Sequence, residues 1–464
     1  MNVFQKIFPF VALLSFILFI GVVWKDYDRP YLEYQRKFKV LLDLKAAGAS
    51  KPAEFRFGIR QRWIKELGIA DRCETCHLGL EDPRFKDAPQ PFKTHPAIAE
   101  HSYEKFGCTV CHGGQGMATT LEDAHGPTEN WYRAIYQDKF MENSCPQCHG
   151  ESIQDQAPVL YRGQTMFYEY GCRGCHKVGA KPRTQTGPPL DEMAKRVKTD
   201  WLYRFLKGPK SYLPLTKMPD PLFSPQEVAD VAAFLLQGPG PEGTGISGDP
   251  VLGKTAFLES GCLVCHTVNG KGGNIGPDLS RVSSKDYPER LFKVIKDPTA
   301  LWPEGKMPVL GIPDQNIRNI VAFLTLECTD PALDKSTVAE QIQLIKDASK
   351  ERGRELVVKQ GCIGCHARIE GVTEIGELGP DLTTFGAVHI SFLDFGDLKV
   401  PFKDHTVPNW IYYKVKSPRI FKEGLKMPDY YFNEEESEAI TTYILGLKGK
   451  ELPASYALPF GERH

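Results

Sequence analysis

The 464-residue sequence carries almost no net charge and has no pattern typical of a nucleic-acid-binding protein. Its 57 Lys and Arg residues nearly balance its 58 Asp and Glu residues, which leaves a formal net charge of −1. It contains no basic run interleaved with aromatic residues. No pattern supports nucleophilic catalysis, phosphate binding or nucleotide recognition. We therefore expect no nucleic-acid partner.

Alternating Val, Ile and Thr residues are scarce, so the sequence predicts few strands. The composition, 41% hydrophobic and 25% charged, is ordinary for globular protein, and the length implies several domains. The 42 glycines and 35 prolines fit many short helices joined by turns. We expect a mainly α fold.

Cysteine is almost absent outside one motif, because 12 of the 13 cysteines belong to six copies of Cys-x-x-Cys-His. Two thiols at this spacing can add to the two vinyl groups of one porphyrin, and the adjacent His then ligates the iron. Zinc sites and disulfides also use Cys-x-x-Cys. A His after the second Cys, six times on an exported chain, favours six covalently bound haem c groups. The predicted attachment cysteines are Cys73, Cys76, Cys108, Cys111, Cys145, Cys148, Cys172, Cys175, Cys262, Cys265, Cys362 and Cys365. The predicted proximal ligands are His77, His112, His149, His176, His266 and His366. For the remaining Cys328, we favour a buried thiol over a disulfide with a partner.

One 18-residue apolar run, from Ile7 to Trp24, is long enough to span a bilayer. A cleaved signal peptide is the alternative, but no small-x-small pair precedes a plausible cleavage point. We therefore favour an uncleaved N-terminal anchor. Lys6 on one side and Lys25 and Arg29 on the other do not settle its orientation. Because covalent haem attachment in bacteria is completed outside the cytoplasmic membrane, we expect the anchor in that membrane and the rest in the periplasm.

The last three motifs lie in a threefold internal repeat. Each repeat has a helical run that begins near a Gly and ends at a Gly before the motif, a Gly-Pro-x-Leu segment after it, and a helix that stops at a proline. A Lys-Met-Pro segment follows, with its Met nine residues past that proline, and an aromatic residue recurs 16 residues past the Met on a final helix. The helical runs begin near Gly163, Gly253 and Gly353, and the Gly-Pro segments begin at Gly187, Gly276 and Gly379. The three Met residues are Met218, Met307 and Met427, and the aromatic residues are Phe234, Phe323 and Tyr443.

This ordered set of motifs resembles the mono-haem domain of class I cytochrome c, three times over, across residues 159–447. The resemblance implies an N-terminal helix that crosses the C-terminal helix in each copy. Phe167 would face Phe234, Phe257 would face Phe323, and Val357 would meet Tyr443. It also implies that Met218, Met307 and Met427 are the distal iron ligands, although each could be core filler. Met193 is a possible rival in the first copy.

The repeats fix the predicted domain boundaries. We expect an anchor and its flank at 1–30, a helical stalk and tri-haem head at 31–158, and cytochrome c domains at 159–240 (repeat 1) and 248–330 (repeat 2). A spacer at 331–350 precedes a third domain at 351–464 (repeat 3). In the third copy the Met lies 61 residues after the His, against 42 and 41 in the others. The extra residues, near 383–408, include His389 and His405, and we favour a surface insertion over a partner-docking or haem-covering loop.

The segment from Cys73 to His149 holds three motifs in 77 residues, too few for three separate mono-haem folds. Haem groups must form much of this core, which we call the head. The head contains no Lys-Met-Pro. Its three spare histidines, His95, His101 and His125, match in number the three irons that lack a second ligand, and Met117 competes with them. Bis-His ligation is favoured, without an assignment of each His. The stalk, from Tyr27 to Leu67, is predicted to be helical.

Met/His ligation raises a haem potential relative to two nitrogen ligands. The sequence therefore predicts low-potential haems near the membrane and high-potential haems in the repeats. This order suggests an electron relay from a quinol-oxidising membrane complex to a periplasmic cytochrome, oxidase or reductase. The alternative is a multihaem reductase or peroxidase with one open-coordination haem. We expect an electron-transfer protein rather than an enzyme, and a subunit role in a larger complex stays open.

Overall fold

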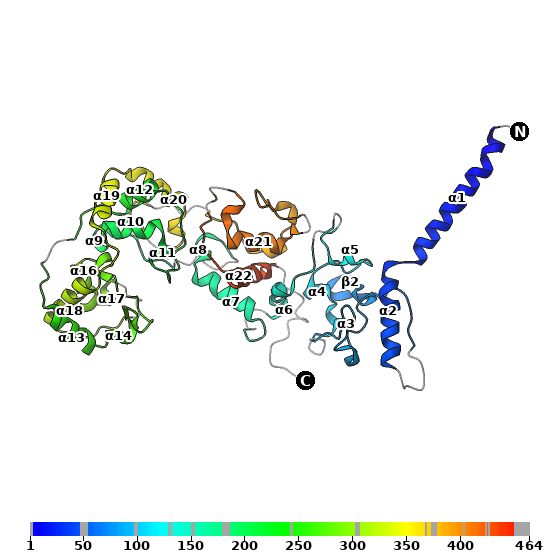
Figure 1. Cartoon of the computed structure of the whole chain (residues 1–464), viewed down its shortest axis with the longest axis horizontal. Coiled ribbons are helices and arrows are strands. Elements are labelled where there is room, and N and C mark those ends of the chain that lie inside the picture. Colours follow the sequence, from blue (N-terminus) through cyan, green and yellow to red (C-terminus); the bar gives the residue numbers. More distant parts are fainter. Residues whose placement is uncertain are drawn as a thin grey trace. The chain divides into compact units, whose positions relative to one another are not determined.

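The computed structural model is mainly helical, as predicted (Figure 1). It describes residues 3–46, 54–96, 101–128, 131, 133–149, 154–178, 186–241, 245–301, 307–366, 369–372, 378–401, 404–422, 425 and 427–449. The chain divides into two compact units. The first comprises Met1–Gln164, Thr384–Tyr413 and Glu435–His464, and the second comprises Thr165–Thr383 and Lys414–Glu434.

In the first unit, α1 (Val3–Tyr27) is an apolar helix with every described side chain exposed. Its segment Lys6–Lys25 has a mean hydropathy of 2.6 and is long enough to cross a bilayer. The described residues of the protein cover none of this segment, which is unusual for so many large apolar side chains in water. The helix is consistent with a membrane anchor.

The helix α2 (Pro30–Lys45) joins the anchor to the head. Phe38 and Leu42 on its buried face pack with Phe85 and Phe92 of the head. Gln35 is fully buried, and its amide nitrogen donates to the carbonyl of Thr75 over a distance of 3.1 Å. A buried amide with a backbone partner fixes the helix in one rotational setting.

The prediction of helix as far as Leu67 is wrong for the end of the stalk. Arg62–Ile64 forms β1, which pairs antiparallel with β2 (Ile69–Asp71), and the 3-10 turn η1 (Lys65–Leu67) joins them. Gly68 closes the turn with φ of 64°, a conformation that glycine adopts without a steric cost. The hairpin delivers Asp71 to the start of the first motif.

The head has little regular structure, as predicted. Its remaining elements are η2 (Cys73–Thr75), η3 (Pro83–Phe85), α3 (Tyr103–Phe106), α4 (Thr109–His112), α5 (Leu121–His125), η4 (Asp138–Ser144) and α6 (Pro146–His149). The insertion of repeat 3 forms η6 (Phe385–Ala387) and η7 (Ile390–Phe392), and Gly386 packs against the backbone of Leu445 in α22 (Glu434–Gly446).

In the second unit, repeat 2 folds on itself. Its elements are α13 (Pro250–Glu259), α14 (Cys262–Cys265), β3 (Thr267–Val268), β4 (Lys271–Gly272), α15 (Val282–Lys285), α16 (Pro288–Lys296), α17 (Pro298–Leu301) and α18 (Asp314–Glu327). Gly253 lets α13 approach α18 closely, because a Cβ at this position would lie 1.9 Å from the carbonyl oxygen of Asn319. The ring centroids of Phe257 and Phe323 are 5.4 Å apart, so the predicted crossing in repeat 2 is confirmed.

Repeats 1 and 3 supply further helices of the second unit, and some of these continue into the first. These are α7 (Pro158–Glu169), α8 (Cys172–Cys175), α9 (Met193–Arg196), α10 (Thr199–Lys207), α11 (Pro209–Tyr212), α12 (Pro225–Leu235), α20 (Lys350–Lys359), η5 (Cys362–Gly364), α21 (Val407–Lys416) and η9 (Pro418–Ile420). The glycine before each motif has a φ near 70°, as expected for a helix-ending residue: Gly171, Gly261 and Gly361.

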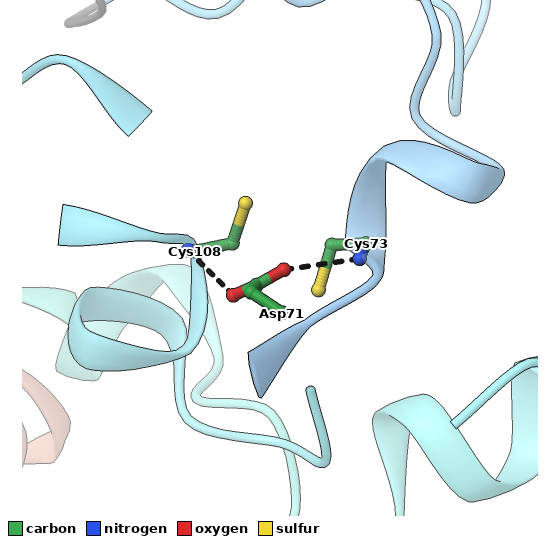
Figure 2. A group of neighbouring side chains, drawn as sticks. All are labelled: Asp71, Cys73 and Cys108. Carbon is green, nitrogen blue, oxygen red and sulfur yellow. Dashed lines mark hydrogen bonds between the residues drawn. The ribbon is translucent and has the colours of Figure 1, made fainter. Parts of the chain in front are cut away.

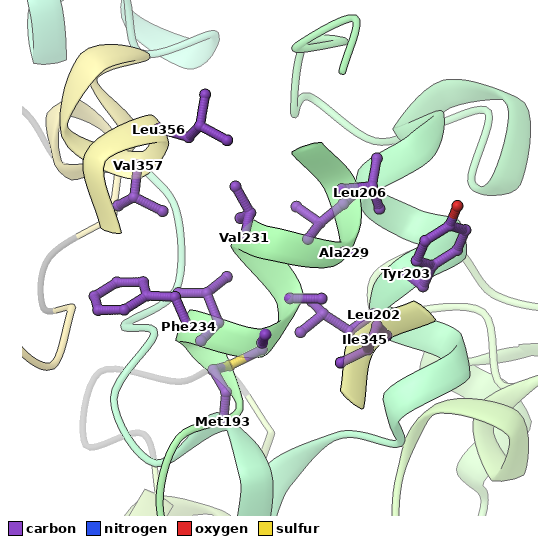
Figure 3. Packing of buried hydrophobic residues seen from close by; sticks show 14 of the residues in the cluster. Met193, Leu202, Tyr203, Leu206, Ala229, Val231, Phe234, Ile345, Leu356 and Val357 are labelled. Carbon is purple, nitrogen blue, oxygen red and sulfur yellow. The ribbon is translucent and has the colours of Figure 1, made fainter. Parts of the chain in front are cut away.

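The predicted crossings within repeat 1 and within repeat 3 are wrong, because the two repeats exchange partners. The C-terminal helix of repeat 1, α12, packs against the N-terminal helix of repeat 3, α20. Phe234 and Val357 share one core, which Figure 3 shows from close by. Gly353 makes the close approach, since a Cβ there would lie 1.9 Å from the carbonyl oxygen of Asp230.

The reciprocal contact lies in the first unit. A Cβ at Gly163 of α7 would lie 1.8 Å from the carbonyl oxygen of Ala439 in α22, the last helix of repeat 3. The predicted boundaries therefore describe sequence repeats, and the helix packing of repeats 1 and 3 crosses them. The spacer also belongs to this packing, because α19 (Lys335–Lys346) lies against α10 and α12 and buries Ile345 in their core.

Candidate haem sites

All six Cys-x-x-Cys-His segments fold into the same tight turn. In each, the backbone N–H of the His donates to the carbonyl oxygen of the first Cys, with distances from 2.8 to 3.0 Å. The turn holds the two cysteines and the His of a motif close together, and all 12 cysteines are half-buried and form no disulfide with one another. One thiol pair and one imidazole per turn are the groups that one covalent haem requires, so the residues fit this cofactor.

Repeat 2 shows how its proximal histidine is held. The ring Nδ1 of His266 lies 2.8 Å from the carbonyl oxygen of Pro277, and the N–H of Gly276 donates to Cys265 over 2.8 Å. A carbonyl at Nδ1 fixes the tautomer and orientation of the ring and leaves Nε2 for a metal. The Gly-Pro segment therefore positions the histidine of its own repeat.

In repeats 1 and 3, each Gly-Pro segment positions the histidine of the other repeat. Nδ1 of His176 lies 3.1 Å from the carbonyl oxygen of Pro380, and Nδ1 of His366 lies 2.7 Å from that of Pro188. The N–H of Gly379 donates to Cys175, and that of Gly187 donates to Cys365. The sequence identified these segments as part of each repeat, but it did not show that each contacts the histidine of the other repeat.

The head brings each motif histidine next to one spare histidine. The ring centroids of the three pairs are 5.8 to 6.3 Å apart. Two imidazoles on opposite sides of one metal ion, with bonds of about 2 Å, have centroids about 6 Å apart. The pairs are His77 with His125, His112 with His95, and His149 with His101. Met117, the competitor, is exposed.

Burial favours the neutral, metal-binding form of the motif histidines. It lowers the pKa of His77 to about 4, with a further contribution from the charge of His125. Burial also lowers the pKa of four other motif histidines: His112, His149, His176 and His366. Metal binding needs an unprotonated ring nitrogen, so these environments suit iron ligation at neutral pH.

A buried carboxylate joins the first two motifs of the head (Figure 2). Asp71 Oδ1 accepts from the N–H of Cys73 over 3.0 Å, and Oδ2 accepts from the N–H of Cys108 over 2.8 Å and from that of Thr109 over 3.1 Å. Both thiols of this cluster belong to haem motifs. We therefore interpret Asp71 as a hydrogen-bond acceptor shared by the backbones of the two motifs, rather than as a ligand of a separate metal site. Sequence reasoning missed Asp71, whose only signal was an acidic residue two positions before a motif.

The methionines of the three Lys-Met-Pro segments are all half-buried. Met218 packs against the core that contains Ile363, and Cys362, the first cysteine of the last motif, packs against the same core. The rival Met193 is buried deep in the same core. Cys328 is fully buried and its pKa is raised to about 11 by burial, so the prediction of a buried thiol is confirmed.

The histidines of the insertion take part in local contacts. The rings of His405 and Phe395 stack with centroids 4.2 Å apart, and Nδ1 of His389 lies 2.8 Å from the hydroxyl of Ser391. These contacts lie within the insertion and involve no haem motif.

Comparison with protein families gives two tandem matches to the cytochrome c family, over residues 160–239 and 250–325. The matches cover repeats 1 and 2. No curated protein matches the chain. Together with the repeated motifs and their common turn, the tandem matches support a multihaem c-type cytochrome.

Proposed function

We propose that the protein binds six haem c groups and relays electrons from a quinol-oxidising membrane complex to a periplasmic cytochrome, oxidase or reductase. Bound haem would supply the redox chemistry by cycling its iron between the ferric and ferrous states. The chain's own residues anchor the relay, orient the ligands and set the two classes of ligation.

The observation that carries the proposal is the pairing of imidazoles in the head. Each motif histidine there faces a second histidine at the spacing of a two-sided ligand set. The repeats instead offer one His and one Met for each iron. Since a thioether ligand raises a haem potential relative to a second imidazole, the head would hold lower potentials than the repeats.

The location follows from α1 and the motifs together. The exposed apolar helix would hold the protein in the cytoplasmic membrane, with the haem motifs on the periplasmic side, where haem c is attached. The low-potential head, which follows the anchor along the chain, would receive electrons from the membrane donor. The repeats would pass them to the acceptor.

Intact mass of the purified protein tests the cofactor count, and six haem adducts are expected. Carbon monoxide binding to the reduced protein separates the relay from the rival reductase or peroxidase, because only an open iron binds this ligand. We expect negligible binding to the wild type. Substantial binding would favour the enzyme.

The variant His125→Ala supplies a positive control, because removal of one distal imidazole should open about one iron in six to carbon monoxide. His389→Ala, which removes a spare histidine in the insertion, should leave binding at the wild-type level. Equal behaviour of the two variants would contradict the role of His125 as a ligand.

A further inference from the structure

We propose that repeats 1 and 3 complete each other's haem sites and hold their two haems as an interlocked pair with crossed axial ligands. In this pair Met427 ligates the iron bound by His176, and Met218 ligates the iron bound by His366. The proposal rests on the proposed function, which supplies the haem groups and the Met ligands.

Repeat 2 provides the internal reference for an unexchanged domain. Its helices α13 and α18 cross at Gly253, and the segment that positions His266 begins at its own Gly276. The carbonyl oxygen of Asn319 faces Gly253, and the Asn319 side chain accepts from the N–H of Asp249 at the start of α13 over 2.9 Å.

The corresponding contacts of repeats 1 and 3 all connect the two repeats. The carbonyl oxygen of Asp230, in α12, faces Gly353, and its side chain accepts from the N–H of Ser349 at the start of α20 over 2.9 Å. Asp230 thus does for α20 what Asn319 does for α13. The histidine contacts follow the same rule, since Pro380 positions His176 and Pro188 positions His366.

The assignment of Met218 to the iron of His366 follows from the position of Met218 in the chain. It lies between the Gly-Pro segment that positions His366 and helix α12, which packs on the helix that leads into Cys362. Both flanking segments therefore belong to the site of His366. Met218 itself packs against the core that contains Ile363.

Met427 lies in the reciprocal position. It follows the segment that positions His176 and precedes Tyr430 and Phe432. The ring centroids of Tyr430 and Phe432 lie 5.8 and 4.9 Å from the ring centroid of Tyr170. Tyr170 stands two residues before Cys172. The segment that follows Met427 thus packs on the entry to the motif of repeat 1.

The two Met segments also interlock. The N–H of Asp220 donates to the carbonyl oxygen of Asp429 over 3.0 Å. Lys210, which follows the helix-stopping proline of repeat 1, donates to the carbonyl oxygen of Tyr430. Its counterpart in repeat 3, Arg419, donates to the carbonyl oxygen of Pro221 over 3.0 Å. The matched contacts indicate a pseudo-symmetric pair.

The exchange places the first and last motifs of the repeats against each other. A Cβ at Gly174 would lie 2.0 Å from the carbonyl oxygen of Gly364, so the two turns touch through their backbones. The thiol sulfur of Cys365 lies 3.9 Å from the carbonyl oxygen of Gly171. The two haem attachment points are therefore direct neighbours, although repeat 2 separates them in the sequence.

Zero-length cross-linking of the intact holoprotein tests the exchange. Lys177 and Asp381 form an exposed ion pair at 3.1 Å, next to His176 and Pro380. In an unexchanged domain, the place of Asp381 would be taken by Pro189, which cannot react. After carbodiimide treatment and isolation of the monomer, we expect a Lys177–Asp381 cross-linked peptide.

The pair Lys254–Glu327 of repeat 2, at 2.8 Å with similar exposure, is the matched control. The control link without the Lys177–Asp381 link would overturn the exchange.

Absorption spectroscopy tests the ligands, because Met-ligated ferric haem has a weak red charge-transfer band. Met218→Ala and Met427→Ala should each remove about a third of this band from the holoprotein. In a background of Cys172→Ser with Cys175→Ser, which lacks the first repeat's haem, Met427→Ala should remove nothing further. Met218→Ala should remove about half of what remains in that background.

The opposite result in this background would overturn the crossed ligation and leave the proposed relay intact. Band loss in neither single variant would instead contradict Met ligation, on which the proposed function rests. The cross-link requires no variant, so it tests the exchange even where a haem-free variant does not fold.

Discussion

Asp71 is a single side chain that connects two haem motifs of the head through three backbone N–H groups. An anion near an iron stabilises the ferric state and so lowers the potential. We expect Asp71→Asn to raise the potentials of the low-potential group, by an amount on the order of tens of millivolts. Spectroelectrochemical titration measures the shift. Asp43→Asn, on the exposed side of α2, should leave the titration unchanged, and equal curves for the two variants would refute the effect.

Asp230 is buried and holds the start of α20 across repeats. Asp230→Ala leaves the N–H of Ser349 without this acceptor and also removes the partner of Arg352, whose Nε lies 3.4 Å from Oδ2. Loss of a buried acceptor costs about 1–3 kcal/mol, so the free energy of unfolding should fall by that amount. Thermal or denaturant unfolding of the holoprotein provides the measurement. The exposed variant Glu351→Ala is the control, and a loss no larger than in this variant would argue against the contact.

At the scale of elements, the exchange of helices makes a directional prediction. A methyl group at Gly163 would collide with the backbone of α22, and one at Gly353 would collide with that of α12. Such overpacking costs about 1–3 kcal/mol. Hydrogen exchange should therefore rise in residues 434–446 for Gly163→Ala and in residues 225–235 for Gly353→Ala. Gly240→Ala, at a site with open space around it, is the control. A response of 225–235 to Gly163→Ala would show the unexchanged arrangement.

The elements themselves could be predicted from the sequence far better than their partners. The helix before each motif and the glycine that ends it follow from local conformational preferences. The crossing of α13 and α18 in repeat 2 also followed from the motif. The exchange between repeats 1 and 3 could not be predicted in this way, because the two repeats contain the same motifs. As a sequence pattern, the N-terminal part of either repeat matches the C-terminal part of both repeats equally well.

The candidate haem ligands show the same limit. Their residue types were predictable, because each Cys-x-x-Cys-His motif can be recognised from five consecutive residues. The pairing of His95, His101 and His125 with particular motifs was not, because it depends on how irregular segments of the head fold over one another. The hairpin that replaces helix before Cys73 was missed for a similar reason, since its strands have only three residues each.

At the scale of the whole molecule, α1 is expected to act as an anchor and nothing else. Replacement of Met1–Tyr27 by a cleavable export signal should therefore release a haem-loaded protein into the soluble periplasmic fraction. The full-length protein should stay with the membranes until detergent is added. Fractionation followed by haem staining provides the measurement. Membrane retention of the anchorless protein after a high-salt wash would show that another part of the chain binds the membrane.

The central claim is that one chain carries two classes of haem, with paired histidines in the head and His with Met in the repeats. A redox titration that resolves the individual haems of the purified holoprotein tests it most directly. We predict three haems at low potential and three at distinctly higher potential. A single undivided cluster of six potentials would contradict the account.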